Sequence, residues 1–409
     1  MEPMLTIGII LLSGFLAGEL ISRIGLPKVT GYILAGIVLN PSVSGIIPQS
    51  FPEHTDWVTH LALAFITFAV GGTLAIPTIR KQGKTILTIT LLEAEMAFLM
   101  IIIGLAALGP WLVDVPANGF LTFLLPLAIL IGSLGSPTDP SATLAVAHEY
   151  KAKGEVSDTI MGVAAFDDAL GIINYSFALV IAQVLVSHQT FSAGAAIGHP
   201  LLVVLGSVAG GMVFGFVFCL VKKALLGDSS EGVLIVFTAG ALCSAFGVAN
   251  LVGLDPLMMT MLMGAFVVNY LPRGDKVFAM LERYTEALIF VLFFTLSGMH
   301  LDFSVLAKTY WLVLVFVLCR GLGKFSGTYL GARFTRASDK VRKYTAGGLI
   351  PQGGIVIGLA LMIHKNPAFD SFADIIISVI IGATVIHELI GPVFAKLTLK
   401  RAHEMGRSS

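Results

Sequence analysis

The sequence predicts an all-α polytopic membrane protein with about thirteen transmembrane helices and inverted repeats that contain two crossing interrupted helices. Three observations support this fold class. The 409 residues are 56% hydrophobic and only 12% charged, a balance that no water-soluble domain of this length tolerates. Windows of about 20 apolar residues recur along the whole chain. Proline, glycine and charged residues interrupt a few of these windows in a repeated order.

Thirteen candidate spans are bounded by polar, proline or glycine residues. The 44 glycines agree with closely packed transmembrane helices, since small residues let helix backbones approach one another. The three cysteines lie in apolar spans without the spacing of a metal site. The candidate spans begin near residues 4, 27, 57, 84, 120, 159, 200, 231, 257, 277, 309, 342 and 371.

The Lys and Arg residues test this count, because loops on the cytoplasmic side carry an excess of them. Of the 25 basic residues, 21 fall after odd-numbered spans or in the tail, and two fall after even-numbered spans. The other two, Arg320 and Lys324, lie within span eleven. The number of spans is therefore predicted to be odd. The N-terminus is expected outside, and residues 399–409 are expected to form a short cytoplasmic tail.

Two adjacent carboxylates, Asp167 and Asp168, lie within the apolar segment 159–186. At about 1.5 Å per residue, Asp168 is roughly 15 Å from the cytoplasmic start of its span. That depth is near the middle of a core about 30 Å thick, where a charge costs at least about 2.5 kcal/mol and marks a candidate functional site. Two adjacent acids in a dry site are not both ionised unless a cation, a proton or a basic group compensates their charge. We expect Asp168 to hold the ion and the proton, and Asp167 a basic partner; a buried structural pair is the alternative.

Spans five and twelve are interrupted about ten residues from their cytoplasmic ends, at residues 135–141 and 349–354. Non-helical backbone at this depth occurs only where protein buries it or where it lines a watery cavity. Such breaks expose carbonyls that bind hard cations. Asp139 followed by Pro140 is equally a helix cap, and the second break is alternatively a kink. The break residues are Ser136, Pro137, Thr138, Asp139 and Pro140 in the first and Pro351, Gly353 and Gly354 in the second; Ser136 and Thr138 carry oxygens that suit Na⁺.

Lys324 and Arg320 are one helical turn apart in span eleven. A desolvated lysine can lose its proton whereas arginine cannot, so Lys324 is the candidate titrating partner and Arg320 a permanent charge. Either base can neutralise Asp167. Three acids at comparable depth are further candidate partners: Glu93 and Glu95, which face different ways on one helix, and Glu388, for which structural pairing is favoured.

The charged and broken spans form two similar triplets. Spans four to six and eleven to thirteen each read as a charged helix, a broken helix and a helix with an acid. The first triplet starts inside and the second starts outside, so their topologies are opposite. Inverted repeats with paired broken helices are typical of secondary transporters that bind ions near the midplane.

Several of these stretches together resemble the monovalent cation:proton antiporter superfamily, and the similarity extends along nearly the whole chain. They are the segment 24–36, which reads IGLPKVTGYILAG, then Asn40-Pro41-Ser42, Thr138-Asp139-Pro140, Phe166-Asp167-Asp168 and Gly323-Lys324.

The resemblance implies a homodimer that exchanges Na⁺ or Li⁺ for H⁺ at Asp168 by alternating access, with Asp167 paired to the lysine of span eleven. It implies a dimerisation part over about 1–56 and 200–299 and a moving core over about 57–199 and 300–398. Within this superfamily, an Asp-Asp pair implies electrogenic exchange. Two features depart from that pattern: Arg320 is typical of the electroneutral branch, and Gly71-Gly72 stand where many relatives carry an acidic residue. The expected location is the bacterial inner membrane, with no cofactor beyond the transported ions.

Other functions stay open at this stage. The nearest alternative is a K⁺/H⁺ antiporter or K⁺ efflux transporter, although the tail leaves no room for the nucleotide-binding domain of gated relatives. An ion channel and a Na⁺-coupled organic-anion symporter are alternatives of another class. Nothing in the sequence indicates an enzyme or a nucleic-acid partner, because it contains no phosphate-binding loop, nucleophile triad or metal cluster.

Overall fold

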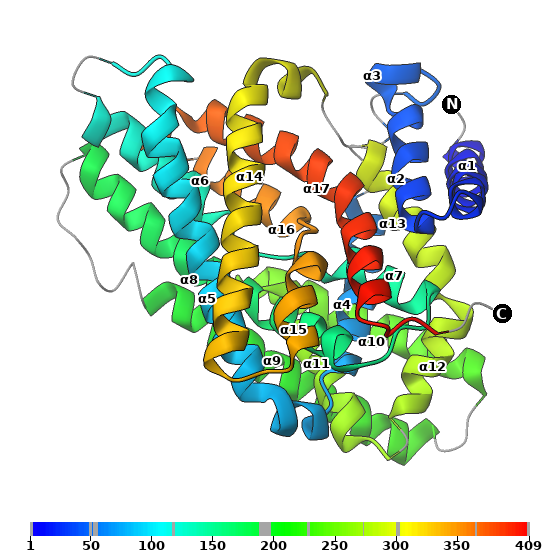
Figure 1. Cartoon of the computed structure of the whole chain (residues 1–409). Coiled ribbons are helices and arrows are strands. Elements are labelled where there is room, and N and C mark those ends of the chain that lie inside the picture. The colour runs from blue at the N-terminus through cyan, green and yellow to red at the C-terminus, as the bar shows by residue number, and fades with distance from the viewer. Residues whose placement is uncertain are drawn as a thin grey trace. The chain divides into compact units, whose positions relative to one another are not determined.

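The computed structural model describes residues 3–48, 51, 56–116, 119–187, 198–226, 230–272, 274–299, 303–364 and 366–406. Every regular element in these ranges is a helix (Figure 1). Seven of the described helices are long and apolar enough to cross a membrane, and five shorter apolar helices accompany them. The prediction of an all-helical membrane protein is therefore confirmed. The predicted twelfth span is divided between short helices on either side of its break.

The tenth span begins later than predicted. Residues from 277 onward were expected to enter the membrane, but Asp275–Tyr284 forms a separate short helix, α12, and α13 begins at Glu286. The reason is charge: α12 carries Lys276, Glu282 and Arg283, whereas α13 is apolar after its first residue. An amphipathic helix of this kind is not suited to cross a hydrocarbon layer.

The chain forms two compact units, here called the first unit and the second unit. They divide the chain differently from the two parts expected from the sequence, since residues 57–83 and 140–151, which were expected in the core part, group with the first unit. The first unit comprises Met1–Gly83, Pro140–Lys151 and Leu202–His300, and the second comprises Lys84–Asp139, Ala152–Leu201 and Leu301–Ser409.

Close packing of α4 against α11 explains why residues 56–73 belong to the first unit. A Cβ atom at Gly71 would overlap the Met261 carbonyl, and one at Gly264 would overlap the Phe68 carbonyl, so only glycine permits this approach. The helices of the first unit are α1 (Pro3–Arg23), α2 (Lys28–Leu39), α3 (Pro41–Ser44), α4 (Asp56–Thr73), α7 (Pro140–Glu149), α9 (His199–Val221), η5 (Lys222–Leu226), α10 (Glu231–Val252), α11 (Pro256–Tyr270), α12 and α13 (Glu286–Met299).

The helix α7 is held within the first unit by polar contacts at its end. His148 Nδ1 lies 2.7 Å from Glu286 Oε2 on α13, and the Lys28 amide donates to Glu149 Oε2 at 2.8 Å. The half-helix that follows the first break is thus fastened to α2 and α13.

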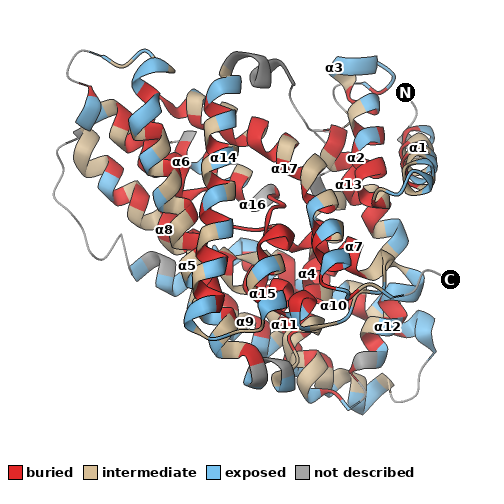
Figure 2. Cartoon of the chain, viewed as in Figure 1, coloured by how far each residue is buried: buried red, intermediate tan, exposed pale blue. Residues whose placement is uncertain are grey.

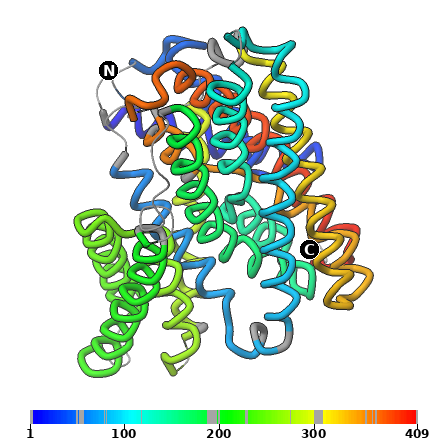
Figure 3. Tube along the Cα trace, turned by 90° about the vertical axis from the view of Figure 1, so that its left-hand side faces the viewer, coloured from blue at the N-terminus to red at the C-terminus, as the bar shows by residue number. Residues whose placement is uncertain are grey.

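A stripe of glycines on α14 sets the geometry of the second unit. Cβ atoms at Gly323, Gly327 and Gly331 would meet the α5 backbone at Ala97, Glu93 and Ile89. Figures 1 and 3 show the blue-to-cyan α5 running beside the yellow α14. The helices of the second unit are α5 (Ile76–Leu108), η2 (Gly109–Trp111), η3 (Phe120–Leu124), α6 (Leu125–Ser133), α8 (Glu155–Ser187), α14 (Phe303–Phe334), α15 (Asp339–Tyr344), η6 (Thr345–Leu349), α16 (Gly354–His364), η7 (Pro367–Phe369) and α17 (Ala373–Arg401).

The segment after α17 packs into the second unit. Glu404 is buried, and its carboxylate accepts hydrogen bonds from the amides of Val156 and Ser157, both at 2.8 Å. Without Glu404, these amides in the first turn of α8 would have no acceptor within the helix. Glu404 therefore caps the helix that carries the Asp pair, and the predicted tail is not simply a solvated extension.

The outer surface carries many large apolar side chains. On α1, for example, Met4, Leu12 and Leu16 are each more than 60% exposed. Figure 2 shows the exposed faces in pale blue and the buried faces in red. A soluble protein rarely exposes so much apolar area, whereas a membrane protein presents such faces to lipid.

We predict that Gly327→Ala destabilises the second unit by about 1 to 3 kcal/mol, the usual penalty for overpacking. The added methyl group would overlap the Leu92 carbonyl and the Glu93 Cα, which are backbone atoms that cannot swing aside. Gly321→Ala is the matched control, because a Cβ there meets nothing within 4 Å. Thermal melting of the purified variants checks this prediction, and equal melting temperatures would contradict it.

Candidate functional site

Two helix breaks meet in the second unit. The first runs from the end of α6 at Ser133 to Pro140, where α7 begins, and the second lies between η6 and α16, which starts at Gly354. The Asp139 amide donates to the Pro351 carbonyl at 3.1 Å. A Cβ at Gly353 would lie 2.5 Å from Asp139 Oδ2, so this close approach requires glycine. The sequence prediction of two interrupted helices that cross is thus confirmed.

Arg320 bridges the two breaks. It is fully buried on α14, where it donates to the carbonyls of Gly135 at 2.9 Å, Pro137 at 2.8 Å and Ile350 at 2.7 Å. Carbonyls at the end of a half-helix carry partial negative charge. The guanidinium therefore compensates exposed backbone dipoles from both breaks.

Lys324, one turn further along α14, has two carboxylate partners. Its Nζ lies 2.6 Å from Glu93 Oε2 on α5 and 3.2 Å from Asp167 Oδ2 on α8. It also donates to Thr138 Oγ1 at 2.8 Å and to the Ser136 carbonyl. The side chains of all three charged residues are inaccessible to solvent. Because α5 and α14 pack so closely at Gly327, Glu93 rather than Glu95 meets the lysine.

The charges of Lys324, Arg320, Glu93 and Asp167 balance when all four residues are ionised. Lys324 and Arg320 supply two positive charges, and Glu93 and Asp167 supply two negative charges. A charge removed from water is stable only when it is paired and hydrogen-bonded. Loss of a partner from this cluster would leave an uncompensated charge in the protein interior.

Asp168 follows Asp167 on α8 and occupies a half-buried position. Adjacent helical residues point about 100° apart, so Asp168 faces a different neighbourhood. One turn later, Gly171 packs on Pro137, with no room for a Cβ between them. The helix that carries Asp168 therefore touches the first break directly. Asp139, within that break, is also half-buried.

Glu95 belongs to a separate polar chain. Its carboxylate accepts a hydrogen bond from Asn174, and Asn174 Nδ2 also lies 3.2 Å from Ser136 Oγ. The two glutamates of α5 thus diverge, as their two-residue spacing predicts. Glu388 lies buried on α17, next to His387.

Three polar residues in the second unit were not singled out from the sequence. Asn174 connects Glu95 to the first break, while Gln352 and His387 are hydrogen-bonded to each other at 2.9 Å. All three are buried. The sequence did contain a signal for these residues, because an uncharged polar residue within an apolar span also needs a buried hydrogen-bond partner.

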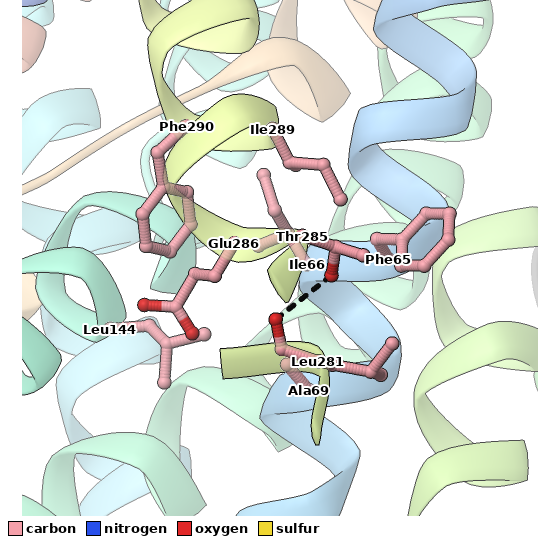
Figure 4. Close-up of a pocket in the computed structure, with 9 residues that line it drawn as sticks. All are labelled: Phe65, Ile66, Ala69, Leu144, Leu281, Thr285, Glu286, Ile289 and Phe290. Atoms are coloured by element: carbon pink, nitrogen blue, oxygen red, sulfur yellow. Dashed lines mark hydrogen bonds between the residues drawn. The ribbon is translucent and has the colours of Figure 1, made fainter. Parts of the chain in front are cut away.

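A small cavity lies elsewhere, within the first unit (Figure 4). Its volume is about 20 Å³, which is room for a single water molecule. Apolar side chains such as Phe65, Ile289 and Phe290 line most of it, and the Glu286 carboxylate that pairs with His148 projects beside Leu144. The cavity contains none of the residues of the buried charge cluster.

Comparison with known proteins shows what the chain is similar to. The family described as sodium/hydrogen exchanger, transmembrane, matches residues 7–401. The probable Na⁺/H⁺ antiporter GerT of Bacillus cereus is 23% identical over 366 residues, covering 86% of this chain and 88% of that protein. The Na⁺/H⁺-K⁺ antiporter GerN of the same organism is 23% identical over 391 residues, covering 93% of each.

The fold also resembles that of a solved structure. The sodium proton antiporter MjNhaP1 from Methanocaldococcus jannaschii, determined at pH 8, superposes with a TM-score of 0.73 and 20% identity over 98% of both chains. That likeness concerns the fold, while the family match spans nearly the whole sequence. The chain belongs to the sodium/hydrogen exchanger family.

Proposed function

We propose that this protein exchanges Na⁺ or Li⁺ for H⁺ across a membrane by alternating access, with Asp168 as the residue that carries either ion. The observation that carries the proposal is the balanced buried cluster beside two crossed helix breaks. Arg320, Lys324, Glu93 and Asp167 compensate one another. Asp168 lies next to this cluster on α8, at a half-buried position, and is the residue to which we assign the transported cation. Relatives named as Na⁺/H⁺ antiporters support the choice of ions.

The mechanism is competition for one carboxylate. Either Na⁺ or a proton neutralises Asp168, and the ion-carrying part crosses the hydrocarbon core only when that charge is compensated, since a bare charge costs several kcal/mol there. Neither ion is then transported alone, because each return step requires the other ion. Exchange requires no enzymatic chemistry and no cofactor.

Oxygens near the break supply the remaining ligands. The carbonyls of Gly135, Pro137 and Ile350 accept from Arg320. We therefore assign Na⁺ to the carboxylates of Asp168 and Asp139, with the hydroxyls of Thr138 and Ser136 as neutral oxygens close by. Carboxylate and hydroxyl oxygens suit a hard monovalent cation.

We assign the second proton of an electrogenic cycle to Lys324. When Na⁺ binds, it draws the Asp167 carboxylate toward itself. The 3.2 Å contact between that carboxylate and Lys324 then weakens. A desolvated lysine can then release its proton. Electrogenic exchange requires that this proton leave the site, so we assign its path from Nζ to the Glu93 carboxylate, 2.6 Å away, and on to the side from which Na⁺ binds. Arg320 keeps its charge throughout the cycle.

The proposal extends to assembly and location. The first unit is assigned to dimerisation and the second to ion transport, in an inner membrane of a bacterial cell with the N-terminus outside. The second candidate function is K⁺/H⁺ exchange, which is favoured by the similarity to GerN, a protein named as a Na⁺/H⁺-K⁺ antiporter. The measurements below distinguish the two cations.

Asp168→Asn is expected to abolish exchange. In sealed proteoliposomes with an imposed pH gradient, adding NaCl or LiCl should dissipate the gradient in the wild type, and the variant should show less than about 1% of that rate, because an amide can neither bind Na⁺ as a carboxylate does nor titrate. Asp158→Asn, at an exposed position on the same helix, is the control. A response to KCl alone would support the K⁺ alternative, and full activity in Asp168→Asn would remove Asp168 from the mechanism.

Acidification on the side where Na⁺ binds should raise the Na⁺ concentration for half-maximal rate. A proton and Na⁺ compete for one carboxylate. Where Asp168 is mostly protonated, the half-maximal Na⁺ concentration should therefore rise about tenfold for each pH unit of acidification. The maximal rate should change little. Exchange rates measured at several pH values and several Na⁺ concentrations check this. A maximal rate that falls while the half-saturating Na⁺ concentration stays constant would refute simple competition.

Lys324→Arg should convert electrogenic exchange to electroneutral exchange, since arginine keeps its proton. The exchange rate of the wild type should fall when the membrane potential is left free and recover when the potential is clamped. The exchange rate of the variant should be the same under both conditions. Lys222→Arg, at the start of η5 in the first unit, controls for the substitution itself. Insensitivity in the wild type would show that Lys324 does not carry a proton.

A further inference from the structure

A buried pair of uncharged polar side chains connects α17 to both breaks. Gln352, within the second break, donates from Nε2 to the Leu134 carbonyl of the first break at 2.7 Å. Its Oε1 lies 2.9 Å from His387 Nδ1. Gln352 is fully buried and His387 is 1% exposed. The mechanism above uses neither residue.

The directions of these hydrogen bonds follow from the groups involved. The Leu134 carbonyl only accepts, so the amide nitrogen of Gln352 must face it and the amide oxygen must face His387. His387 must therefore donate from Nδ1. Burial disfavours a positive charge on the imidazole, because a charged ring would lose its hydration. His387 is accordingly a neutral imidazole with its proton on Nδ1.

Close helix packing makes this contact possible. Gly391 lies one turn after His387 on α17, and a Cβ there would stand 2.8 Å from Pro351 Cγ. The glycine thus lets α17 approach the second break from the same side as His387. The edge of the His387 ring also faces Phe316, with ring centroids 6.3 Å apart. The imidazole is held in place by these neighbours.

We propose that the His387–Gln352 pair is a specificity device, which fixes the spacing between the two breaks and so makes the site prefer Na⁺ to the larger K⁺. This inference rests on the proposed function. His387 and Gln352 are positioning residues, because they act on the break backbone rather than on the ion.

The physical basis is the number and placement of oxygens around a bare ion. A cation that sheds water needs oxygens at distances matched to its size, and a loosened set of ligands accommodates a larger cation more readily. Asp139 and Thr138 lie in the first break, four or five residues after Leu134. The contact from Gln352 to Leu134 fixes the start of that break against the second one. Loss of the contact should therefore relax the ligand spacing without removing any ligand.

The test compares initial exchange rates with NaCl, LiCl and KCl in proteoliposomes for the wild type, His387→Leu and Gln352→Leu. Each variant should lower the ratio of Na⁺ rate to K⁺ rate by about fivefold, the factor expected for one neutral hydrogen bond. His387→Asn should restore most of the ratio, because its amide can donate from nearly the position of Nδ1. Thr384→Val on the same helix is the control, since the buried Thr384 hydroxyl has no hydrogen-bond partner among the residues that the structure describes.

The outcomes separate this inference from the proposed function. If the wild type exchanges no cation for protons, the proposed function fails. If the wild type exchanges Na⁺ and every variant keeps its ratio, or loses all rates in equal proportion, the specificity device is refuted. Should the leucine variants not fold, ¹⁵N NMR of the wild-type imidazole decides: a neutral ring protonated on Nδ1 supports the pair, and the other tautomer or an imidazolium overturns it.

Discussion

The pairing of Lys324 with two carboxylates is the interaction on which the second unit depends. Two cations and two acids lie where solvent does not reach, and any one of them alone would cost several kcal/mol. Their mutual compensation fixes the relative positions of α5, α8 and α14. The glycine stripe on α14 brings the backbones close enough for the contact, and Arg320 extends the same principle to the carbonyls of both breaks.

The two bases of α14 have different kinds of partner. Arg320 is hydrogen-bonded to backbone carbonyls of both breaks, while Lys324 is paired with the carboxylates of Glu93 and Asp167. Asp168, half-buried on the neighbouring face of α8, is the residue that we assign to the transported ion. Gln352 and His387 add an uncharged connection between the same breaks. Ion pairs and neutral hydrogen bonds thus both connect the elements around the two breaks.

Much of this arrangement follows from the sequence. Apolar windows and basic loops predict the spans, and Pro-Gly interruptions predict the breaks, because bilayer depth and backbone chemistry leave few alternatives. Three features needed the structure. Which of Glu93 and Glu95 reaches Lys324 depends on how α5 rotates against the glycines of α14. The late start of α13 depends on the charged helix before it. The bond from His387 to Gln352 joins residues 35 positions apart, a pairing that periodicity does not encode.

The cap that Glu404 provides has a consequence for biosynthesis. The amides that it satisfies belong to the start of α8, some 247 residues earlier in the chain. During translation α5 and α8 therefore enter the membrane with their acids before Lys324 exists to neutralise them, and α8 gains its cap only when the residues after α17 emerge. Until then, the acids lack the lysine and α8 lacks the cap that the folded second unit provides.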